Sequence, residues 1–239
     1  MPPRLLSVRV LSVVAALLLV GLFTVNRCGL VPHNSLPHRP HDAKLPLASV
    51  AKNPGLQLEL VWKNEQIQAI VDPATPDVRE ANVDDIVVGN TIDSFLFIPV
   101  YAAFLVALGA LGWVAHQRRA STLLTCIAVG VAIVVIADWL ENIAILEAVR
   151  HLAEGTLQRL DARDISDSAL VKWSTLVVVL GALGWLLVTA RLWWTWLLGL
   201  ASFAVAAVIA YGLLAYTTER ARGVSPSVSV IVVERTSRG

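Results

Sequence analysis

The chain has 239 residues, of which 56% are hydrophobic and 15% are charged, and its mean hydropathy is +0.67. Soluble globular proteins are about 45–50% apolar and about 25% charged, so this composition argues against a cytosolic enzyme and against a disordered chain. The net charge of +1 leaves no basic field for nucleic acid, and Cys28 and Cys126 are too few for a disulfide scaffold or a multi-cysteine metal site. The class that remains is an all-α, polytopic bundle of membrane helices.

Five apolar stretches are long enough to cross a membrane, which takes about 20 mostly apolar residues for a hydrocarbon layer of roughly 30 Å. We therefore expect five transmembrane helices, over residues 5–25, 94–115, 120–146, 170–190 and 192–217. The first stretch also fits a cleaved signal peptide, because arginines precede its apolar run, and the bundle would then have four helices. Since no small-x-small cleavage motif follows it, we favour an uncleaved signal anchor over residues 1–25.

Arginines gather on one side of this predicted topology. If the five helices alternate in direction, one side carries five arginines and no acid, namely Arg4, Arg9, Arg118, Arg119 and Arg191. On the other side, residues 26–93 hold six basic and nine acidic residues, and residues 147–168 hold three and five. Lysine and arginine near the ends of a span are retained in the cytoplasm. We therefore expect a multi-pass protein of the bacterial inner (plasma) membrane with a cytoplasmic amino terminus.

Residues 26–92 are expected to form an extracytoplasmic linker that contains one short amphipathic helix. Its first half is rich in proline and carries four side chains that could ligate a metal, His33, His38, His41 and Asp42. A proline-rich linker lacks the rigid frame that metal ligands need, so we expect neither a metal nor a cofactor. Residues 56–71 have apolar positions at helical spacing, which predicts a helix that lies on the membrane or caps the bundle.

The remaining chain is expected to form a four-helix membrane bundle over residues 93–217 and a tail over residues 218–239. Within the bundle the sequence LGALGW occurs twice, at residues 108–113 and again at residues 180–185. The repeat indicates either a duplicated pair of helices or convergence on small residues that let membrane helices approach closely. Besides the lipid bilayer, the expected partner is a second copy of the chain, bound through the glycines of the repeat: Gly109, Gly112, Gly181 and Gly184.

Several polar residues of the predicted spans share one depth. Ionisable groups inside a bilayer are costly unless they are paired or hydrated. Counted from the predicted helix ends at about 1.5 Å per residue, Tyr101 lies about 10 Å deep and Asp138 about 12 Å deep. Asp138, Glu141 and Asn142 are spaced i, i+3 and i+4, so they share one helical face. The predicted cluster near the outer face consists of Asp93, Tyr101, Asp138, Glu141, Asn142 and Lys172.

This cluster has two interpretations. It is either a polar pin, in which Lys172 pairs with Asp138 or Glu141 and sets the helix register, or a functional site for a proton, an ion or a polar ligand. We expect a structural or accessory protein of the cell envelope, with a small proton-coupled transporter or relay as the alternative. An intramembrane lipid-modifying enzyme is a third class, and no nucleophile elbow, H-E-x-x-H motif or phosphate loop supports it.

Three runs of the sequence occur in a fixed order: Asp93–Tyr101 (DSFLFIPVY), Asp138–Asn142 (DWLEN) and Lys172–Trp173 (KW). Together they resemble a pattern in uncharacterised bacterial multi-pass membrane proteins, which carry Asp-x-x-Phe…Tyr, Asp-x-x-Glu-Asn and Lys-aromatic motifs. The resemblance covers about residues 93–190, and it implies no specific function. It implies that the six polar residues of the predicted cluster belong together.

Overall fold

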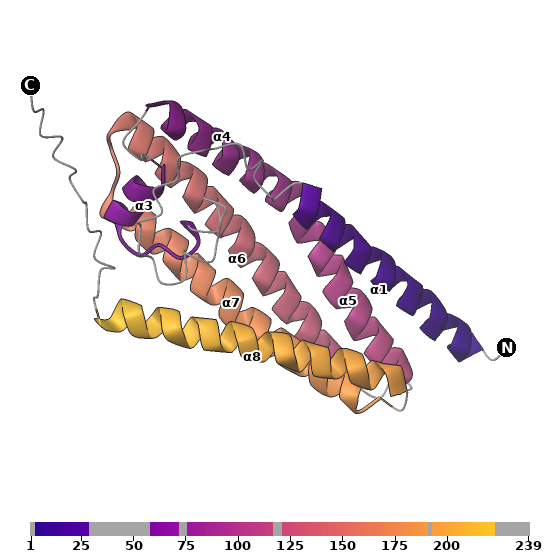
Figure 1. Ribbon diagram of the computed structural model, residues 1–239. Helices are drawn as coiled ribbons and strands as arrows, with labels where there is room; N and C mark the ends of the chain where they lie inside the picture. The colour runs from indigo at the N-terminus through magenta and orange to yellow at the C-terminus, as the bar shows by residue number, and fades with distance from the viewer. Residues whose placement is uncertain (1–2, 29–57, 72–75, 117–120, 191–192, 223–239) are drawn as a thin grey trace, which may run out of the picture.

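The computed structural model describes residues 3–28, 58–71, 76–116, 121–190 and 193–222 (Figure 1). The regular elements of these residues are all helical, which confirms the predicted all-α fold. In chain order they are α1 (Pro3–Cys28), α3 (Asn64–Val71), α4 (Pro76–Ile92), the π-helical turn η1 (Asp93–Phe97), α5 (Ile98–Ala115), α6 (Ser121–Glu154), α7 (Arg159–Val188) and α8 (Trp193–Arg222).

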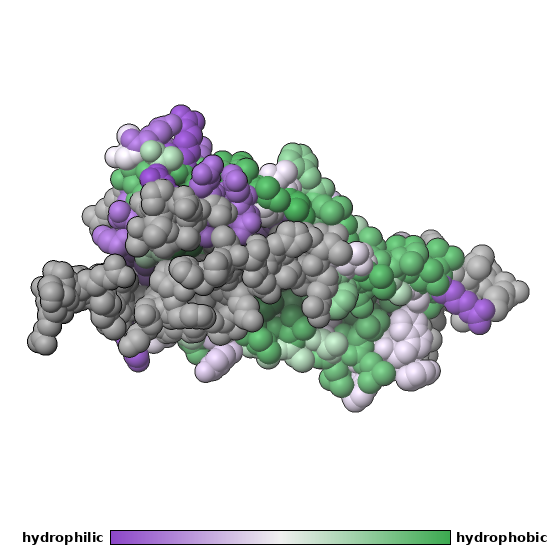
Figure 2. Space-filling view, turned by 45° about the horizontal axis from the view of Figure 1, so that its top comes forward, coloured by the Kyte–Doolittle hydropathy of each residue, from purple (hydrophilic) through white to green (hydrophobic). Residues whose placement is uncertain are grey.

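Four helices are long and apolar enough to cross a membrane, over Asn82–Ala115, Ser121–Glu154, Leu160–Val188 and Trp193–Arg222. The apolar stretch of α1 is shorter, Val8–Thr24. Large apolar side chains remain on the outside of the bundle; Val178 and Val208, for example, are 70% and 72% exposed. Figure 2 shows that hydrophobic surface runs along the helices, whereas hydrophilic residues gather at the end that carries α3. This distribution is that of a bundle of membrane helices.

The helices are longer than the spans predicted from hydropathy. The 34 residues of α6 make a helix of about 50 Å, which exceeds a hydrocarbon layer of roughly 30 Å. The chain is also helical from Pro76 through α4 and η1 into α5, whereas the prediction placed residues 76–92 in the linker. Hydropathy misses these turns because they carry acids, such as Asp84 and Asp85 in α4. The helices therefore project beyond the apolar layer at the end that carries α3.

Successive long helices run antiparallel: α6 packs extensively against α7 and α7 against α8, while α5 packs on α6 and α1 on α5 (Figure 1). Glycines of the repeated LGALGW sequence make three of the close contacts: a Cβ added at Gly112 would lie 2.6 Å from Leu186, and one at Gly109 or Gly184 would lie 3.0 Å from Leu124 or Phe203. Around Gly181 there is open space. Equivalent glycines of the two LGALGW repeats thus have different neighbours. Association of two protein chains through these glycines stays a prediction.

Two hydrophobic cores follow one another along the bundle. The membrane core lies between α1, α5, α6, α7 and α8, and its members include Leu108, Ile127, Val179 and Leu183. The cap core lies beyond it, between α3, α4, α6 and α7, and its members include Leu58, Ile67, Ile86, Ile145 and Ile165. The helix predicted for residues 56–71 is helical over Asn64–Val71 and covers this end of the bundle. Asp138, Glu141 and Asn142 of α6 and Lys172 of α7 lie between the two cores.

The end of α1 indicates where the apolar layer stops. A Cβ at Gly21 would lie 3.7 Å from Val100 of α5, and the two helices run in opposite directions (Figure 1). Thr24, which ends the apolar stretch of α1, is therefore about one turn farther out, level with Phe97. Asp93 and the start of η1 thus lie about one turn beyond the level at which the apolar stretch of α1 ends, and Tyr101 lies about one turn inside it.

Candidate functional site

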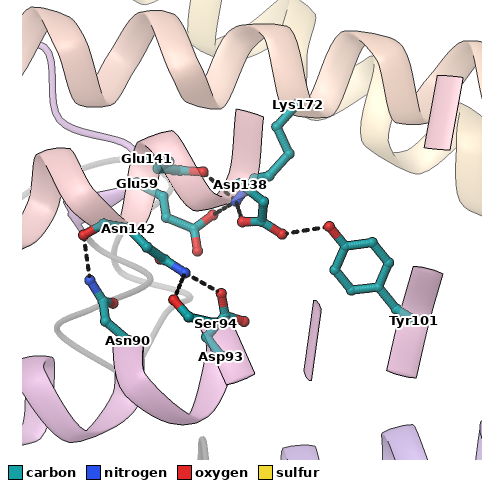
Figure 3. Close-up of polar contacts among 9 residues, drawn as sticks. All are labelled: Glu59, Asn90, Asp93, Ser94, Tyr101, Asp138, Glu141, Asn142 and Lys172. Atoms are coloured by element: carbon teal, nitrogen blue, oxygen red, sulfur yellow. Dashed lines mark hydrogen bonds and ion pairs between the residues drawn. The ribbon is translucent and has the colours of Figure 1, made fainter. Parts of the chain in front are cut away.

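Lys172 is the centre of the polar cluster, and it is surrounded by three carboxylates (Figure 3). Its Nζ lies 3.0 Å from Asp138 Oδ1, 3.0 Å from Glu59 Oε2 and 2.5 Å from Glu141 Oε2. Asp138 and Glu141 come from adjacent turns of α6, whose i, i+3 spacing turns both toward α7. Lys172, Asp138 and Glu141 are 5%, 6% and 0% exposed, so the ion pairs are formed inside the protein.

Asp138 also connects Lys172 to α5. Its Oδ2 accepts a hydrogen bond of 2.8 Å from the hydroxyl of Tyr101, while its Oδ1 faces the ammonium. The depth estimate from the sequence placed Tyr101 and Asp138 at one level, and this hydrogen bond is consistent with it. Both oxygens of this buried carboxylate therefore have partners, as buried polar groups require.

Asn142 makes the remaining hydrogen bonds of the cluster. Its Nδ2 donates to Asp93 Oδ2 at 2.7 Å and to Ser94 Oγ at 3.0 Å, and its backbone oxygen accepts from Asn90 Nδ2 at 3.2 Å. The six residues predicted from the sequence thus form two groups: Lys172 with Asp138, Glu141 and Tyr101, and Asn142 with Asp93 (Figure 3).

The turn η1 is the reason that Asp93 and Ser94 face α6. Pro99 has no N–H to donate to the carbonyl of Phe95, so the regular hydrogen-bond ladder cannot continue there. The helix instead forms a π-turn, in which the N–H of Ile98 reaches the carbonyl of Asp93. Such single turns occur frequently at functional sites. The Ser94 carbonyl also accepts a hydrogen bond of 3.1 Å from Trp139 Nε1.

Sequence inspection missed three participants, Glu59, Asn90 and Ser94. Glu59 is the most important, because it supplies a third carboxylate to Lys172 from a segment 113 residues away. Its neighbours Leu58 and Val61 are 1% and 0% exposed in the cap core, and they hold this segment over α7. Within residues 56–71 Glu59 lay off the apolar stripe, like any solvated acid, and its sequence context carries no signal of the ion pair.

The cluster contains more acid than base. Four carboxylates, those of Glu59, Asp93, Asp138 and Glu141, lie in this layer with the single ammonium of Lys172. Neither oxygen of Glu141 has a hydrogen-bond partner among the described residues, so its contact with Lys172 is an ion pair alone. Burying a charge without full compensation is costly. A buried carboxyl group in excess of the base is neutralised by a proton or balanced by a further cation.

A cavity of about 410 Å³ borders the cluster. Its polar end is formed by Glu59, Asp93, Asp138 and Lys172, and Phe97, Tyr101, Phe104 and Trp173 add aromatic rings. The rest of the wall is aliphatic and comes from α5, α6, α7 and α8, with Leu105, Val134, Leu180 and Val205 among its members. A second cavity of about 170 Å³ between α7 and α8 shares Glu59 and Trp173 with the first. The arrangement can hold a molecule with one polar and one apolar end.

A second polar network ties α7 to α8 nearer the end of the bundle. Tyr216 and Ser166 share a hydrogen bond of 2.5 Å between their hydroxyls, and Arg220 Nη1 donates to Ser166 Oγ at 2.6 Å. Arg220 Nη2 also pairs with Asp167 Oδ1 at 3.0 Å. The ring of Trp62 packs edge-on against Tyr216. We call these residues the rim network.

Metal ligation finds no support in the described residues, which contain no group of three or more His, Cys, Asp or Glu side chains placed to hold an ion. The linker residues His33, His38, His41 and Asp42 lie outside the described residues. No protein-family model, curated protein or solved structure matches the chain. The function of the site consequently has to be inferred from its own chemistry.

Proposed function

We propose that this chain is an accessory protein of the bacterial inner membrane that binds an amphipathic small molecule in the cavity beside Lys172. The observation that carries the proposal is the cavity wall, which joins a charged end to an aromatic and aliphatic remainder. Pockets for small ligands have volumes of roughly 300–1,000 Å³ and combine an apolar lining with a few polar groups, and this cavity of about 410 Å³ is of that kind.

The position of the cavity supports a ligand drawn from the membrane. We propose that the polar end of the cavity is near headgroup depth, because Asp93 lies about one turn beyond the level at which the apolar stretch of α1 ends. The apolar wall continues from there into the membrane core. An amphipathic molecule at this depth keeps its chain among aliphatic side chains and its headgroup in the polar layer.

The same proposal includes the topology. We propose a multi-pass protein whose amino terminus is cytoplasmic, because five arginines and no acid fall on that side of a five-helix arrangement. The cavity would then open toward the extracytoplasmic side. Cysteine labelling of intact cells at Ser121 and Glu154, the first and last residues of α6, would test the orientation, and labelling at Ser121 from outside would overturn it.

Filling the cavity tests the proposed function. Val205→Trp adds an indole to the cavity wall at a position that is 50% exposed and thus outside the tightly packed core. Val208→Trp makes the same change on the same helix at a position that is 72% exposed and does not line the cavity, so it is the matched control. The probe is a 16-carbon alcohol with a nitrobenzoxadiazole label at its far end, titrated by fluorescence into the full chain in phosphatidylcholine nanodiscs.

We expect saturable binding of this probe to the wild-type chain and to Val208→Trp, and at least a ten-fold weaker affinity for Val205→Trp. Equal binding by the two tryptophan variants would mean that the probe is held by the nanodisc lipid or elsewhere on the protein. That result, or an absence of saturable binding to the wild type, overturns the proposal.

Proton coupling is the second candidate, because Glu141 is fully buried and its oxygens lack hydrogen-bond partners among the described residues. Against it, residues 102–115, 121–137 and 173–188 carry no acidic or basic side chain that could continue a relay through the membrane core. The test is proton flux into liposomes that contain the protein and a trapped pH-sensitive dye. A relay requires flux that Glu141→Gln abolishes, and flux equal to that of empty liposomes excludes it.

A further inference from the structure

The hydrogen-bond donors of the polar layer are already used. Lys172 is surrounded by three carboxylates within 3.0 Å of its Nζ, two of which accept its hydrogen bonds and the third of which forms an ion pair, so its ammonium is already engaged with acids of the protein. The hydroxyl of Tyr101 donates to Asp138, and the amide of Asn142 donates to Asp93 and Ser94. The groups that remain for a ligand in this layer are therefore mainly acceptors.

Two of the four carboxylates line the cavity and keep one oxygen outside the contacts described above. Asp138 and Glu141 are 6% and 0% exposed and are turned toward Lys172. Glu59 and Asp93 are less deeply buried and line the cavity, and each uses one oxygen for the contacts described above, Glu59 to Lys172 and Asp93 to Asn142. Each has a second carboxylate oxygen that can accept a hydrogen bond.

The charge of the polar layer also favours a ligand that donates hydrogen bonds. With one lysine among four carboxylates, a ligand that brings positive charge offsets part of the excess acid, whereas an anionic ligand adds to it. The ring of Trp173 already has a cation beside it, because Lys172 Nζ lies 4.9 Å from its centroid. The carboxylates are thus the groups that recognise the headgroup.

We propose that the ligand of this cavity carries a primary ammonium headgroup on an apolar chain, and that Glu59 and Asp93 receive the ammonium. The inference rests on the proposed binding of an amphipathic molecule and specifies its chemical class. The chain of the ligand lies along the aliphatic wall, and its N–H groups donate to the second oxygens of the two acids. Glu59 belongs to the segment that covers the end of the bundle. A bound headgroup therefore also links this segment to the membrane helices.

Three probes with the same 16-carbon chain and fluorophore test this inference, with an amine, a hydroxyl or a carboxyl as the headgroup. They are titrated into the full chain in phosphatidylcholine nanodiscs. The signal from the Val205→Trp variant measures the part of the binding that is due to the nanodisc lipid. We expect the amine to bind about ten-fold more tightly than the alcohol, and the acid to bind most weakly, since hydrogen bonds between charged groups are the strong ones.

Variants of the two acids identify the site. Glu59→Gln and Asp93→Asn should each weaken binding of the amine about ten-fold and leave binding of the alcohol unchanged. Glu65→Gln is the matched control, because Glu65 is an exposed acid of α3 that does not line the cavity. Thermal unfolding of each variant checks the fold, and if one acid proves necessary for folding, the other variant still decides the question.

The outcomes separate the two proposals. If none of the three probes binds saturably, the proposed function fails. If the alcohol and the acid bind as tightly as the amine, or if neither acid variant changes the preference, the cavity accepts amphipathic molecules and the ammonium inference alone is overturned. Butylamine that displaces the long-chain amine at equal concentration would show that a free amine suffices, which overturns the requirement for an apolar chain.

Discussion

Two polar networks join α7 to its neighbours, and they differ in charge balance and burial. In the rim network, Arg220 faces Asp167 and two neutral hydroxyls, and the side chains of Arg220 and Asp167 are 31% and 49% exposed. In the cluster around Lys172, three carboxylates face one ammonium, and the lysine side chain is 7% exposed. The rim network has the composition of a structural contact between two helices, and water can help to solvate its charged side chains.

The difference indicates which network has a role beyond holding helices together. A pin between α6 and α7 needs one acid for Lys172, and further buried acids make the folded state less stable unless a proton or another charge neutralises them. The rim network has no such surplus. A cavity borders the Lys172 cluster and includes Glu59, Asp93 and Asp138 in its wall. Excess acid beside a cavity supports the proposed binding site, whereas the balanced charges of the rim network need only a structural role.

Lys172→Met should have the largest effect on stability, because it leaves three buried carboxylates without a counter-charge. Breaking a buried ion pair from one side costs about 3–5 kcal/mol. Thermal unfolding in detergent, followed by intrinsic fluorescence, should show a clear fall in Tm. Combining Lys172→Met with Glu59→Gln, Asp138→Asn and Glu141→Gln should restore most of the loss. A single variant that unfolds at the wild-type temperature would contradict the central place of the lysine.

Asp138→Asn and Glu141→Gln should have different effects on stability, although both remove a carboxylate of α6. Both oxygens of Asp138 accept hydrogen bonds, from Tyr101 and from Lys172, so an amide there loses a charge-assisted partner and costs roughly 1–3 kcal/mol. Glu141 has no hydrogen bond to lose among the described residues, and its amide reduces the excess of buried charge. We expect Asp138→Asn to lower Tm and Glu141→Gln to leave it unchanged or raise it. The reverse order would show that Glu141 is the main partner of Lys172.

Tyr216→Phe should have the smallest effect. It removes one hydroxyl from the rim network, and Arg220 can still donate to Ser166, so the loss is about 1 kcal/mol. The same unfolding measurement applies, and binding of the 16-carbon amine should not change, because the rim network lies outside the larger cavity. A drop in Tm as large as that of Lys172→Met would remove the distinction between the two networks.

Much of the site could be predicted because it depends on helix geometry. The spacing of Asp138, Glu141 and Asn142 and the depth of Tyr101 follow from 3.6 residues per turn and a rise of about 1.5 Å per residue. Glu59 could not be predicted in this way, since it reaches Lys172 from a separate segment. The π-turn at Asp93–Phe97 was also missed, although Pro99 is the signal that could have indicated it.

The extent of the helices was underestimated for a related reason. Hydropathy identifies the part of a helix that lies in lipid, and it is insensitive to turns that continue into water. Acids such as Asp84 and Asp161 end an apolar stretch without ending the helix. Those turns matter, because they form the cap core that holds Glu59 over the site.

The sequence by itself determined that the chain is an all-helical membrane protein, and it predicted that six polar residues gather near one end of the spans. These properties are local, since apolar length and helical periodicity depend on residues that are close along the chain. Only the tertiary structure decided that a third acid joins Lys172, that the layer holds four carboxylates for one lysine, and that a cavity lies beside it. Charge balance and empty space depend on which elements meet, and the packing of the cap segment, α5, α6, α7 and α8 around one point decides both.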